Sequence, residues 1–409
     1  MRDSALGRPF WTLWAAFTAS NLADGLSLVA LPLLANELTD DARLVAGVAV
    51  FQYLPFLLIG LPAGVVIDRF DRRWVAVTAQ MLRVVVVGGL GLVLTTGDGS
   101  IGLLFVVAFL IGSCEVMVDG GVPALVRSVV GPSQLEVANA RMSATQTVSN
   151  AFVGPPVGAL LFTFDPSLPF MVAGAVALVS IVTLVRLPGR YRSEQSVDTL
   201  PLHRRMVVGV RYVWGHPVLR PLVIAVGTFS FVGAAGNGVF VILVTERFGI
   251  DGVGFGLLIS VDAVASVVTS FFVAGIVRRR SHSWSMRLAV ICFVVGALLF
   301  GLFTVAAVAF VAAVFNGISG PTWNVVSATV RQRLVPDEVF GRMMTAYLFI
   351  AWGMRPLGAL LGGVVAEAWG AQWVSIGSAF VVASLLLSGR RMFRLVDQSM
   401  RGADAAVGE

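Results

Sequence analysis

Two carboxylates and a guanidinium recur at intervals of four and eight residues in the segment "EVMVDGGVPALVR", which follows an almost purely apolar run. If this segment is helical, Glu115, Asp119 and Arg127 lie along one face. A charged group at the centre of a bilayer costs roughly 2.5–3.5 kcal/mol on insertion scales, so it is rarely kept without a use. The segment therefore predicts a functional site inside a membrane.

The composition is that of a membrane protein. Hydrophobic residues make up 57% of the chain and charged residues 13%, whereas a soluble domain has roughly 25% charged residues. The apolar runs are each near the roughly 20 residues that cross the hydrocarbon core as a helix. We expect an all-α membrane protein with 12 transmembrane helices at residues 10–35, 44–67, 74–94, 101–126, 137–164, 169–187, 218–245, 253–277, 284–303, 307–331, 338–365 and 371–389. The ninth and tenth are separated on length alone, since "LFGLFTVAAVAFV" contains no polar turn.

The basic residues predict the topology. All 29 are arginine, and with the N-terminus in the cytoplasm nearly all of them fall at cytoplasmic ends or loops. Arg43 and Arg247 lie outside on this reading, and Arg355 lies within a span. Because positive charge is enriched on the cytoplasmic side, we expect both termini to be cytoplasmic. The net charge of +6 reflects this topology, and we expect no nucleic-acid partner.

The residues needed for most enzyme chemistry are missing. The three histidines, His203, His216 and His282, lie in predicted loops, and the two cysteines lie in apolar runs. No metal-ligand cluster or pairing of a nucleophile with a base is evident. A Gly-rich phosphate loop ending in lysine is excluded because the chain has no lysine. We expect no enzyme activity, no metal and no cofactor.

The sequence predicts two related halves. The basic connection at residues 188–217 separates an N-terminal six-helix half, 1–187, from a C-terminal half, 218–391, with a cytoplasmic tail at 392–409. "PVGALL" at 156–161 recurs as "PLGALL" at 356–361, and "AGVV" at 63–66 resembles "AGIV" at 274–277. Arg127 with Pro132 matches Arg331 with Pro336 at the same spacing. Three matches in one order indicate an internal duplication, as in many secondary transporters.

Several motifs resemble those of the major facilitator superfamily. "GVVIDRFDRR" at 64–73 is similar to its signature between the second and third helices, although Asp71 replaces the usual second glycine. "GPPVG" at 154–158 resembles the core of a motif found in its exporters. "NLADGL" at 21–26, "EVMVDGG" at 115–121, "LEVANA" at 135–140 and "LVPDEVFGRM" at 334–343 look like the branch of macrolide-efflux and enterobactin-exporter-like proteins, drug:proton antiporters.

The resemblance implies two six-helix halves related by a pseudo-twofold axis, and a cytoplasmic gate. In the family the signature aspartate faces the start of the eleventh helix, where an anion gains roughly 0.3–1 kcal/mol. The alternative is that these charges only fix the topology. The residues of this predicted gate are Gly64, Asp68, Arg69, Arg72, Arg73 and Arg127.

The fifth predicted span carries a helix-bend motif. Gly154, Pro155, Pro156 and Gly158 remove side chains and backbone donors within about one turn. Such a helix can bend and approach a neighbour closely. A plain packing kink and a role specific to exporters are both open, so the direction of transport rests on the resemblance.

The resemblance also places the first, second, fourth and fifth helices of each half around a central cavity. Asp24, Glu115 and Asp119 would share it, with Arg83 as a possible partner. Burial raises the pKa of a carboxyl group and a nearby arginine lowers it, so a movement that changes the pairing can load or release a proton. The alternative is a fixed ion pair that holds helices together without titrating.

Further polar residues fall in the predicted spans. Asp262 and Arg355 lie in the eighth and eleventh spans, and we expect them to form a structural pair. The remainder face substrate or bond to neighbouring helices, with neither preferred: Asn21, Gln146, Asn150, Asn237, Asn316 and Asn324.

The sequence therefore predicts a proton-coupled exporter of small lipophilic or amphipathic molecules in a bacterial inner membrane, acting as a monomer. Its partners would be a small-molecule substrate, protons and the lipid bilayer. Acids outnumber arginines in the spans, which favours cationic or neutral cargo. The alternatives are an exporter of a siderophore or another anionic metabolite, an uptake transporter, and a membrane scaffold that transports nothing.

Overall fold

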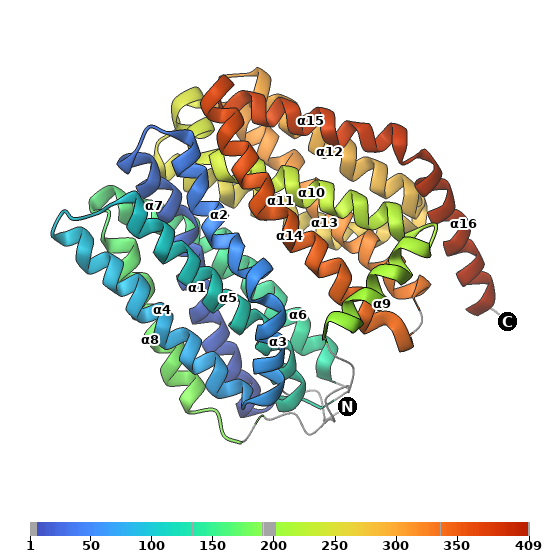
Figure 1. Ribbon diagram of the computed structural model, residues 1–409, viewed down its shortest axis with the longest axis horizontal. Coiled ribbons are helices and arrows are strands. Elements are labelled where there is room, and N and C mark those ends of the chain that lie inside the picture. Colours follow the sequence, from blue (N-terminus) through green and yellow to red (C-terminus); the bar gives the residue numbers. More distant parts are fainter. Residues whose placement is uncertain (1–5, 132–133, 190, 192–201, 336, 408–409) are drawn as a thin grey trace. The chain divides into compact units, whose positions relative to one another are not determined.

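A computed structural model of the 409-residue chain describes residues 6–131, 134–189, 191, 202–335 and 337–407. Every regular element in the described residues is helical (Figure 1). The chain forms two compact units: unit 1 is Met1–Asp40, Gly47–Thr199 and Ile250–Ser260, and unit 2 is Asp41–Ala46, Leu200–Gly249 and Val261–Glu409. The helix that starts at Ala42 and the helix that starts at Gly252 therefore each divide between the two units. Pro132 and Pro336, used in the repeat comparison, lie outside the described residues.

The helices of the first half of the chain run in order from α1 to α8. Their bounds are α1 (Arg8–Leu38), α2 (Ala42–Leu58), α3 (Gly60–Arg69), α4 (Arg72–Thr95), α5 (Ile101–Val129), α6 (Leu135–Gln146), the π-helical turn η2 (Thr147–Val153), α7 (Gly154–Phe164) and α8 (Leu168–Val185). Helix α1 is the most deeply packed, and it contacts α5, α6, α7, α8 and η2. It forms the centre of unit 1.

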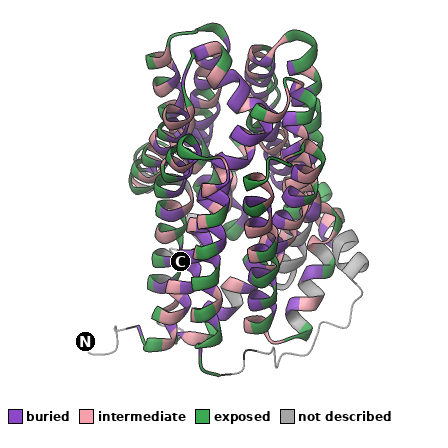
Figure 2. Ribbon diagram, turned by 90° about the vertical axis from the view of Figure 1, so that its left-hand side faces the viewer, coloured by how far each residue is buried: buried purple, intermediate pink, exposed green. Residues whose placement is uncertain are grey.

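The second half of the chain begins after residues 192–201. Its elements are α9 (Leu202–Gly215), α10 (Leu219–Ile242), the π-helical turn η3 (Leu243–Arg247), α11 (Gly252–Arg279), α12 (His282–Leu302), α13 (Ala306–Leu334), α14 (Asp337–Trp369), α15 (Ala371–Ser388) and α16 (Arg390–Val407). Within unit 2, α10 packs on α14, and α12 packs on α13 and α15. Individual helices carry buried and exposed residues on different faces (Figure 2).

Eleven helices in the described residues are long and apolar enough to cross a membrane. The predicted second span, 44–67, is the exception, because it is divided at Ile59 into α2 and α3. Pro62 lacks the N–H that would continue the helical ladder to Leu58, which accounts for an interruption at this point. The predicted division between the ninth and tenth spans is confirmed, since α12 ends at Leu302 and α13 begins at Ala306.

Glycines allow the first and fifth spans of the first half to meet backbone to backbone. A Cβ atom on Gly154 would lie 2.5 Å from Cα of Gly25, and one on Gly158 would lie 2.7 Å from the carbonyl oxygen of Leu26. Real Cβ atoms do not approach other atoms so closely, so only glycine fits. The glycines of the helix-bend motif therefore serve the contact between α7 and α1.

The two prolines of that motif leave helical carbonyls without their usual donors. Pro156 has no N–H to donate to the carbonyl of Phe152, four residues earlier. The hydroxyl group of Ser260 donates to that carbonyl, with 3.0 Å between Oγ and O. The turn η2, directly before the prolines, is π-helical. The irregular backbone is thus hydrogen-bonded to α11 inside unit 1.

The repeated motif makes the same kind of contact in the second half. A Cβ atom on Gly358 would lie 2.0 Å from the carbonyl oxygen of Phe231, and one on Gly362 would lie 2.3 Å from that of Ala235. Gly158 and Gly358 occupy the same position in "PVGALL" and "PLGALL". Each packs against the first span of its own half, α1 or α10. The sequence motif that is repeated in the two halves therefore makes an equivalent helix–helix contact in each.

This packing predicts that Gly158→Ala and Gly358→Ala each lower the melting temperature of the purified protein. The added methyl group must push two helices apart, which typically costs about 1–3 kcal/mol. Thermal unfolding in detergent, followed by size-exclusion chromatography, measures the change. Gly102→Ala is the matched control, because nothing lies within 4 Å of a Cβ atom there. Equal melting temperatures for all three variants would contradict the prediction.

Candidate functional site

The predicted acidic residues come from two helices of unit 1. Asp24 lies near the middle of α1, and Glu115 and Asp119 lie one turn apart on α5. Arg83 lies on α4, which packs on α5 and α8. Ser100 starts α5 by accepting a hydrogen bond from the backbone N–H of Leu103. The helix then continues without interruption to Val129, so it carries both acids into the apolar region on one rigid element.

A buried ion pair joins α1 to α4. Nη1 of Arg83 lies 2.6 Å from Oδ1 of Asp24, and the two side chains are only 3% and 17% exposed. The same Nη1 donates to the hydroxyl oxygen of Ser20 at 3.2 Å. The amide of Gln80 also donates to that oxygen, at 2.6 Å. The guanidinium of Arg83 is therefore fixed by a charge and a hydroxyl group on neighbouring turns of α1.

Glu115 stands beside this pair. Its Oε1 accepts a hydrogen bond from Nε2 of Gln52 at 3.4 Å, which is a long contact. Its charge interacts with those of Asp24, Arg83 and Asp119. Asp119, one turn further along α5, is exposed and interacts electrostatically with Asp24 and Arg83. Three carboxylates thus share one guanidinium, and among the described residues no other cation is seen to act on Glu115 or Asp119.

Sequence reasoning missed the neutral residues that complete this cluster. Ser20, Gln52 and Gln80 come from α1, α2 and α4, and each makes one of the hydrogen bonds described above. Their signal in the sequence was a polar side chain within an apolar span, and Gln80 lies one helical turn before Arg83. With them, four helices contribute to one polar cluster.

The expected pair between Asp262 and Arg355 does not form. The guanidinium of Arg355 lies over the ring of Trp352, 3.9 Å from its centroid. Asp262 has no ion pair or hydrogen bond in the part of the chain that the structure describes. Stacking on an aromatic face next to it in α14 satisfies the guanidinium locally. Asp262 is therefore a mid-span carboxylate without a counter-charge.

The predicted polar residues differ in their surroundings. Asn21 is buried and donates to the carbonyl of Phe17 in its own helix, at 2.9 Å. Asn316 is half-buried, and its Oδ1 lies near Gly296 of α12 without a hydrogen-bond donor among the described residues. Asn150 is half-buried. The exposed members of the set are Gln146, Asn237 and Asn324.

The predicted gate is only partly described. The side chain of Asp68 and the surroundings of Gly64 lie outside the described part of the structure. Arg69 and Arg127 are exposed in the last turns of α3 and α5. Arg72 and Arg73 begin α4 and contact the segment that follows α8. The gate itself remains a prediction.

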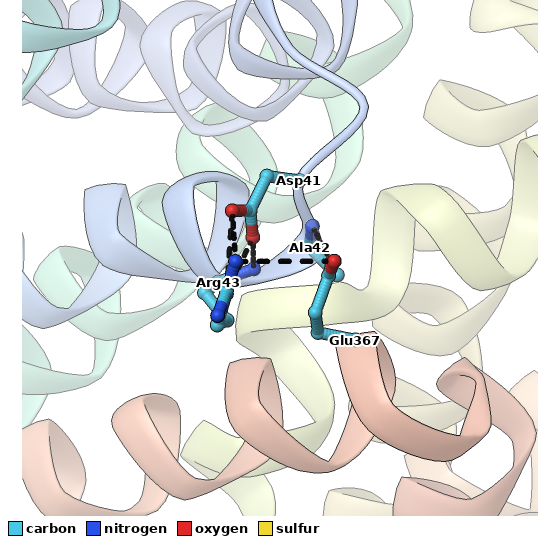
Figure 3. A network of polar contacts seen from close by, with 4 residues as sticks. All are labelled: Asp41, Ala42, Arg43 and Glu367. Atoms are coloured by element: carbon cyan, nitrogen blue, oxygen red, sulfur yellow. Dashed lines mark hydrogen bonds and ion pairs between the residues drawn. The ribbon is translucent and has the colours of Figure 1, made fainter.

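A second polar network surrounds the start of α2, within unit 2 (Figure 3). Nη2 of Arg43 lies 2.7 Å from Oδ2 of Asp41 and 4.0 Å from Oε1 of Glu367 on α14. The backbone N–H of Ala42 donates to Oε2 of Glu367 at 2.9 Å. A Cβ atom on Gly363, one turn before Glu367, would lie 2.7 Å from Cβ of Ala46. Glu367 thus caps the first turn of α2, which packs tightly on α14.

No group of three or more histidine, cysteine, aspartate or glutamate residues suited to a metal ion was found within the described ranges. The polar cluster of unit 1 consists of acids, one guanidinium, amides and a hydroxyl group. These groups can exchange protons and hold a charged or polar ligand.

The sequence profile of the Major Facilitator Superfamily matches residues 13–350. The chain belongs to this superfamily. It is a multi-pass membrane transporter and not an enzyme.

Solved structures of the superfamily fold resemble it over nearly its whole length. The nucleoside transporter NupG aligns with a TM-score of 0.77 at 11% identity, covering 95% of this chain and 99% of that one. A bacterial homologue of the iron transporter ferroportin, in an inward-facing state, aligns with a TM-score of 0.73 at 15% identity, covering 94% and 99%.

Two efflux proteins that match over most of their length are distant relatives of this chain. Macrolide efflux protein A of Streptococcus pyogenes is 22% identical over 384 residues, which cover 91% of this chain and 93% of that protein. The multidrug efflux pump Tap of Mycolicibacterium fortuitum is 26% identical over 385 residues, covering 90% and 92%. An uncharacterised transporter of Mycobacterium tuberculosis is 36% identical over 148 residues, so the match spans only 36% of this chain and 33% of that protein.

The buried ion pair predicts a loss of stability in Arg83→Gln. Removing the guanidinium leaves the buried Asp24 without its counter-charge, so its carboxylate must either stay charged in a desolvated site or take up a proton. Breaking a buried pair in this way costs about 3–5 kcal/mol. The melting temperature in detergent should therefore fall clearly. The double variant Arg83→Gln with Asp24→Asn should recover part of the loss, because no buried charge is then left alone. A single variant as stable as the native chain would refute a structural role for the pair.

The network around Arg43 predicts a melting temperature that depends on pH. Hydrogen bonds from the Arg43 side chain lower the pKa of Asp41 from 3.8 to about 2. Because the pKa in the folded state is depressed, the charged carboxylate stabilises the fold above about pH 4. This contribution is lost as the pH falls towards 2. The native chain should therefore melt at a slightly higher temperature than Asp41→Asn at pH 5, and the difference should vanish near pH 2. A difference that does not change with pH would contradict this role.

Proposed function

We propose that this transporter is a proton-coupled exporter of small lipophilic or amphipathic molecules, such as drugs or secondary metabolites. The observation that carries the proposal is the excess of acid in the polar cluster of unit 1, where Asp24, Glu115 and Asp119 share Arg83. The efflux functions named for the relatives in Streptococcus pyogenes and Mycolicibacterium fortuitum support the direction of transport. The bacterial relatives also support a location in the cytoplasmic membrane. The distribution of arginine supports termini inside the cell.

The coupling follows from competition for one cation. In this structure Arg83 is bonded to Asp24, and Glu115 has only a long amide contact. A carboxylate without a cation in a low-dielectric site favours its neutral form, so Glu115 would hold a proton in this state. A movement of α5 relative to α1 and α4 would bring Glu115 closer to Arg83. The proton would then be released, and alternating access would deliver it to the other compartment.

The energetics allow transport against a gradient. Moving one charge through about 100 mV yields roughly 2.3 kcal/mol. Because about 1.4 kcal/mol is a factor of ten, one proton can sustain roughly a 50-fold gradient of a neutral substrate. No nucleotide is needed on this account. We propose that the protein works as a monomer, because one chain supplies both halves and in each half the first and fifth spans are already in contact.

The unpaired carboxylate on α11 supports cationic or neutral cargo. Asp262 lies on the face of the helix opposite to Val264, which is 44% exposed and belongs to the exposed apolar stripe with Leu257, Val268 and Phe271. An acid on that face could accept an amine of the cargo. The family resemblance places α11 beside the cavity, which is consistent with this role.

An anionic cargo, such as a siderophore, is the second candidate. Arg331 on α13 is buried, and its Nε and Nη1 have no hydrogen-bond acceptor among the described residues. Its guanidinium lies over the ring of Tyr347, 3.8 Å from the centroid. A carboxylate or phosphate group could satisfy these two donors. The two candidates therefore depend on different residues, Asp262 or Arg331.

Transport into inverted membrane vesicles tests the proposal. Glu115→Gln, alone and with Asp119→Asn, should abolish uptake driven by a proton gradient, because neither amide can carry a proton, while expression and melting temperature stay near those of the native chain. Asp98→Asn is the matched control, since Asp98 is exposed in the loop before α5 and bonds only to Thr96 among the described residues. Unchanged proton-driven uptake in the glutamine variant would end the role of Glu115.

The substrate panel should contain lipophilic cations, neutral drugs and anionic chelators. Loss of cation transport in Asp262→Asn favours the first cargo class, and loss of anion transport in Arg331→Gln favours the second. If intact cells accumulate the compounds and inverted vesicles do not, the direction is uptake and the export proposal fails. If no compound of any class moves, the proposal of transport for such molecules fails.

A further inference from the structure

A set of hydrogen bonds, which we call the clasp, joins the turn before α4 to the segment that follows α8. The backbone N–H of Tyr191 donates to Oδ2 of Asp71 at 3.1 Å, and the backbone N–H of Arg72 donates to the carbonyl of Tyr191 at 3.3 Å. Nη1 of Arg73 donates to the carbonyl of Leu187 at 2.5 Å. The clasp thus comprises Asp71, Arg72, Arg73, Leu187 and Tyr191, all within unit 1.

Asp71 is the residue that serves both sides of the clasp. Its Oδ1 accepts from the backbone N–H of Arg73 at 2.9 Å and so starts α4, while its Oδ2 is left to accept from Tyr191. Both acceptors belong to one carboxylate, and hydrogen bonds to charged acceptors are the stronger ones. A glycine, which the family signature has at this position, could make neither bond.

The segment after α8, residues 187–189 and 191, is held against α4 by its conformation and its packing. Gly189 has a φ of +112°, a value that residues with a side chain rarely adopt. The hydroxyl group of Tyr191 then donates to the carbonyl of Pro188. Leu187 and Tyr191 are 0% and 7% exposed, and they belong to one apolar cluster with Ala76 and Val77 of α4. The segment is therefore packed as well as hydrogen-bonded.

The second half has a counterpart of different construction. Asp397 on α16, which follows the last span, accepts from the backbone N–H of Ser283 at 3.0 Å and from its hydroxyl group. Ser283 lies in the first turn of α12. The guanidinium of Arg287 lies over the ring of Phe393, 5.2 Å from its centroid. In both halves, then, an aspartate fastens the chain after the sixth span to the start of the third.

We propose that Asp71 is a positioning residue for transport, which fastens the linker between the two halves to the turn that carries the predicted gate. This role rests on the proposed function. Tyr191 lies near the start of the connection at residues 188–217, and Asp71 lies three residues from Asp68 in the sequence. With the clasp closed, a displacement of the linker acts directly on the gate turn.

Asp71→Gly is the test, because it restores the glycine of the family signature. Glycine is tolerated at the start of a helix, so α4 should still form. If Asp71 had no role of its own and only the family signature were needed, this variant would transport at least as well as the native chain. The clasp predicts a roughly ten-fold fall in the maximal transport rate with KM changed less than about two-fold, because linker motion and not cargo binding is affected. Asp71→Asn, which keeps one acceptor oxygen, should recover part of the rate.

Limited proteolysis of membrane vesicles reports on the clasp without any transport measurement. Trypsin cleaves after arginine, and the peptide bond after Arg186 leads directly to Leu187, which the clasp holds and which is 0% exposed. Cleavage there should be roughly ten-fold faster in Asp71→Gly than in the native chain, because local opening controls access of the protease. Asp397→Ala is the matched control. It removes the equivalent aspartate contact with α12, so it should leave cleavage after Arg186 and the transport rate near native values.

Two results would overturn the proposal. Native cleavage in Asp71→Gly would show that Asp71 does not hold the segment, and faster cleavage with a native transport rate would show that the clasp does not act on transport. If Glu115→Gln abolishes transport while Asp71→Gly does not, only this proposal fails. If the native chain moves no compound of the panel, the proposed function fails and the role in transport fails with it, while the cleavage assay still reports whether the clasp exists.

Discussion

A guanidinium group that is almost completely buried needs a counter-charge, and the arrangement of unit 1 depends on how Arg83 obtains one. Asp24 supplies the counter-charge from α1, and Ser20 adds an acceptor one turn earlier on the same helix. The bond joins α4 to the central helix of the unit. It also leaves Glu115 and Asp119 on α5 without a cation of their own among the described residues. The pair therefore holds the helices together and creates the excess of acid on which proton coupling would depend.

Close contact between helices is the second constraint, and glycine provides it in both halves. Gly154 and Gly158 bring α7 against α1, and Gly358 and Gly362 bring α14 against α10. In a bilayer the association of helices depends on close packing and hydrogen bonds, because lipid tails are as apolar as the side chains. Two helices in such contact can move only together or by sliding. The first and fifth spans of each half are thus expected to behave as one rigid element during transport.

Much of the architecture could be predicted from the sequence, because hydrophobic length, the repeat and the family motifs are linear signals. The boundary between α12 and α13 was found on length alone. The break at Ile59 was missed, because the proline that causes it lies within an apolar run that is long enough to span. The members of the acidic cluster could be named from their charge. Which acid would bind Arg83 could not, because that depends on the relative rotation of α1, α4 and α5.

The errors have the same physical origin. Asp262 and Arg355 were paired because their charges are opposite, but Arg355 stacks on Trp352, which lies three residues away in the same helix. The clasp could not be predicted from the sequence, because two of its donors are the backbone N–H groups of Tyr191 and Arg72, and the side chain of Arg73 donates to a backbone carbonyl. Asp71 was noted in the sequence only as a departure from the family signature. A residue that breaks a family pattern can thus mark an interaction particular to one chain.

The complete absence of lysine restricts which side chains can bind and release protons within the bilayer. A guanidinium group keeps its positive charge at every physiological pH, whereas a buried ammonium group can become neutral. The three histidines are found at or beyond the ends of the predicted spans. Every cation inside the spans is therefore permanent, and acidic side chains are left as the natural proton carriers across the apolar core. In such a transporter, a proton could bind within the membrane only by neutralising a negatively charged side chain.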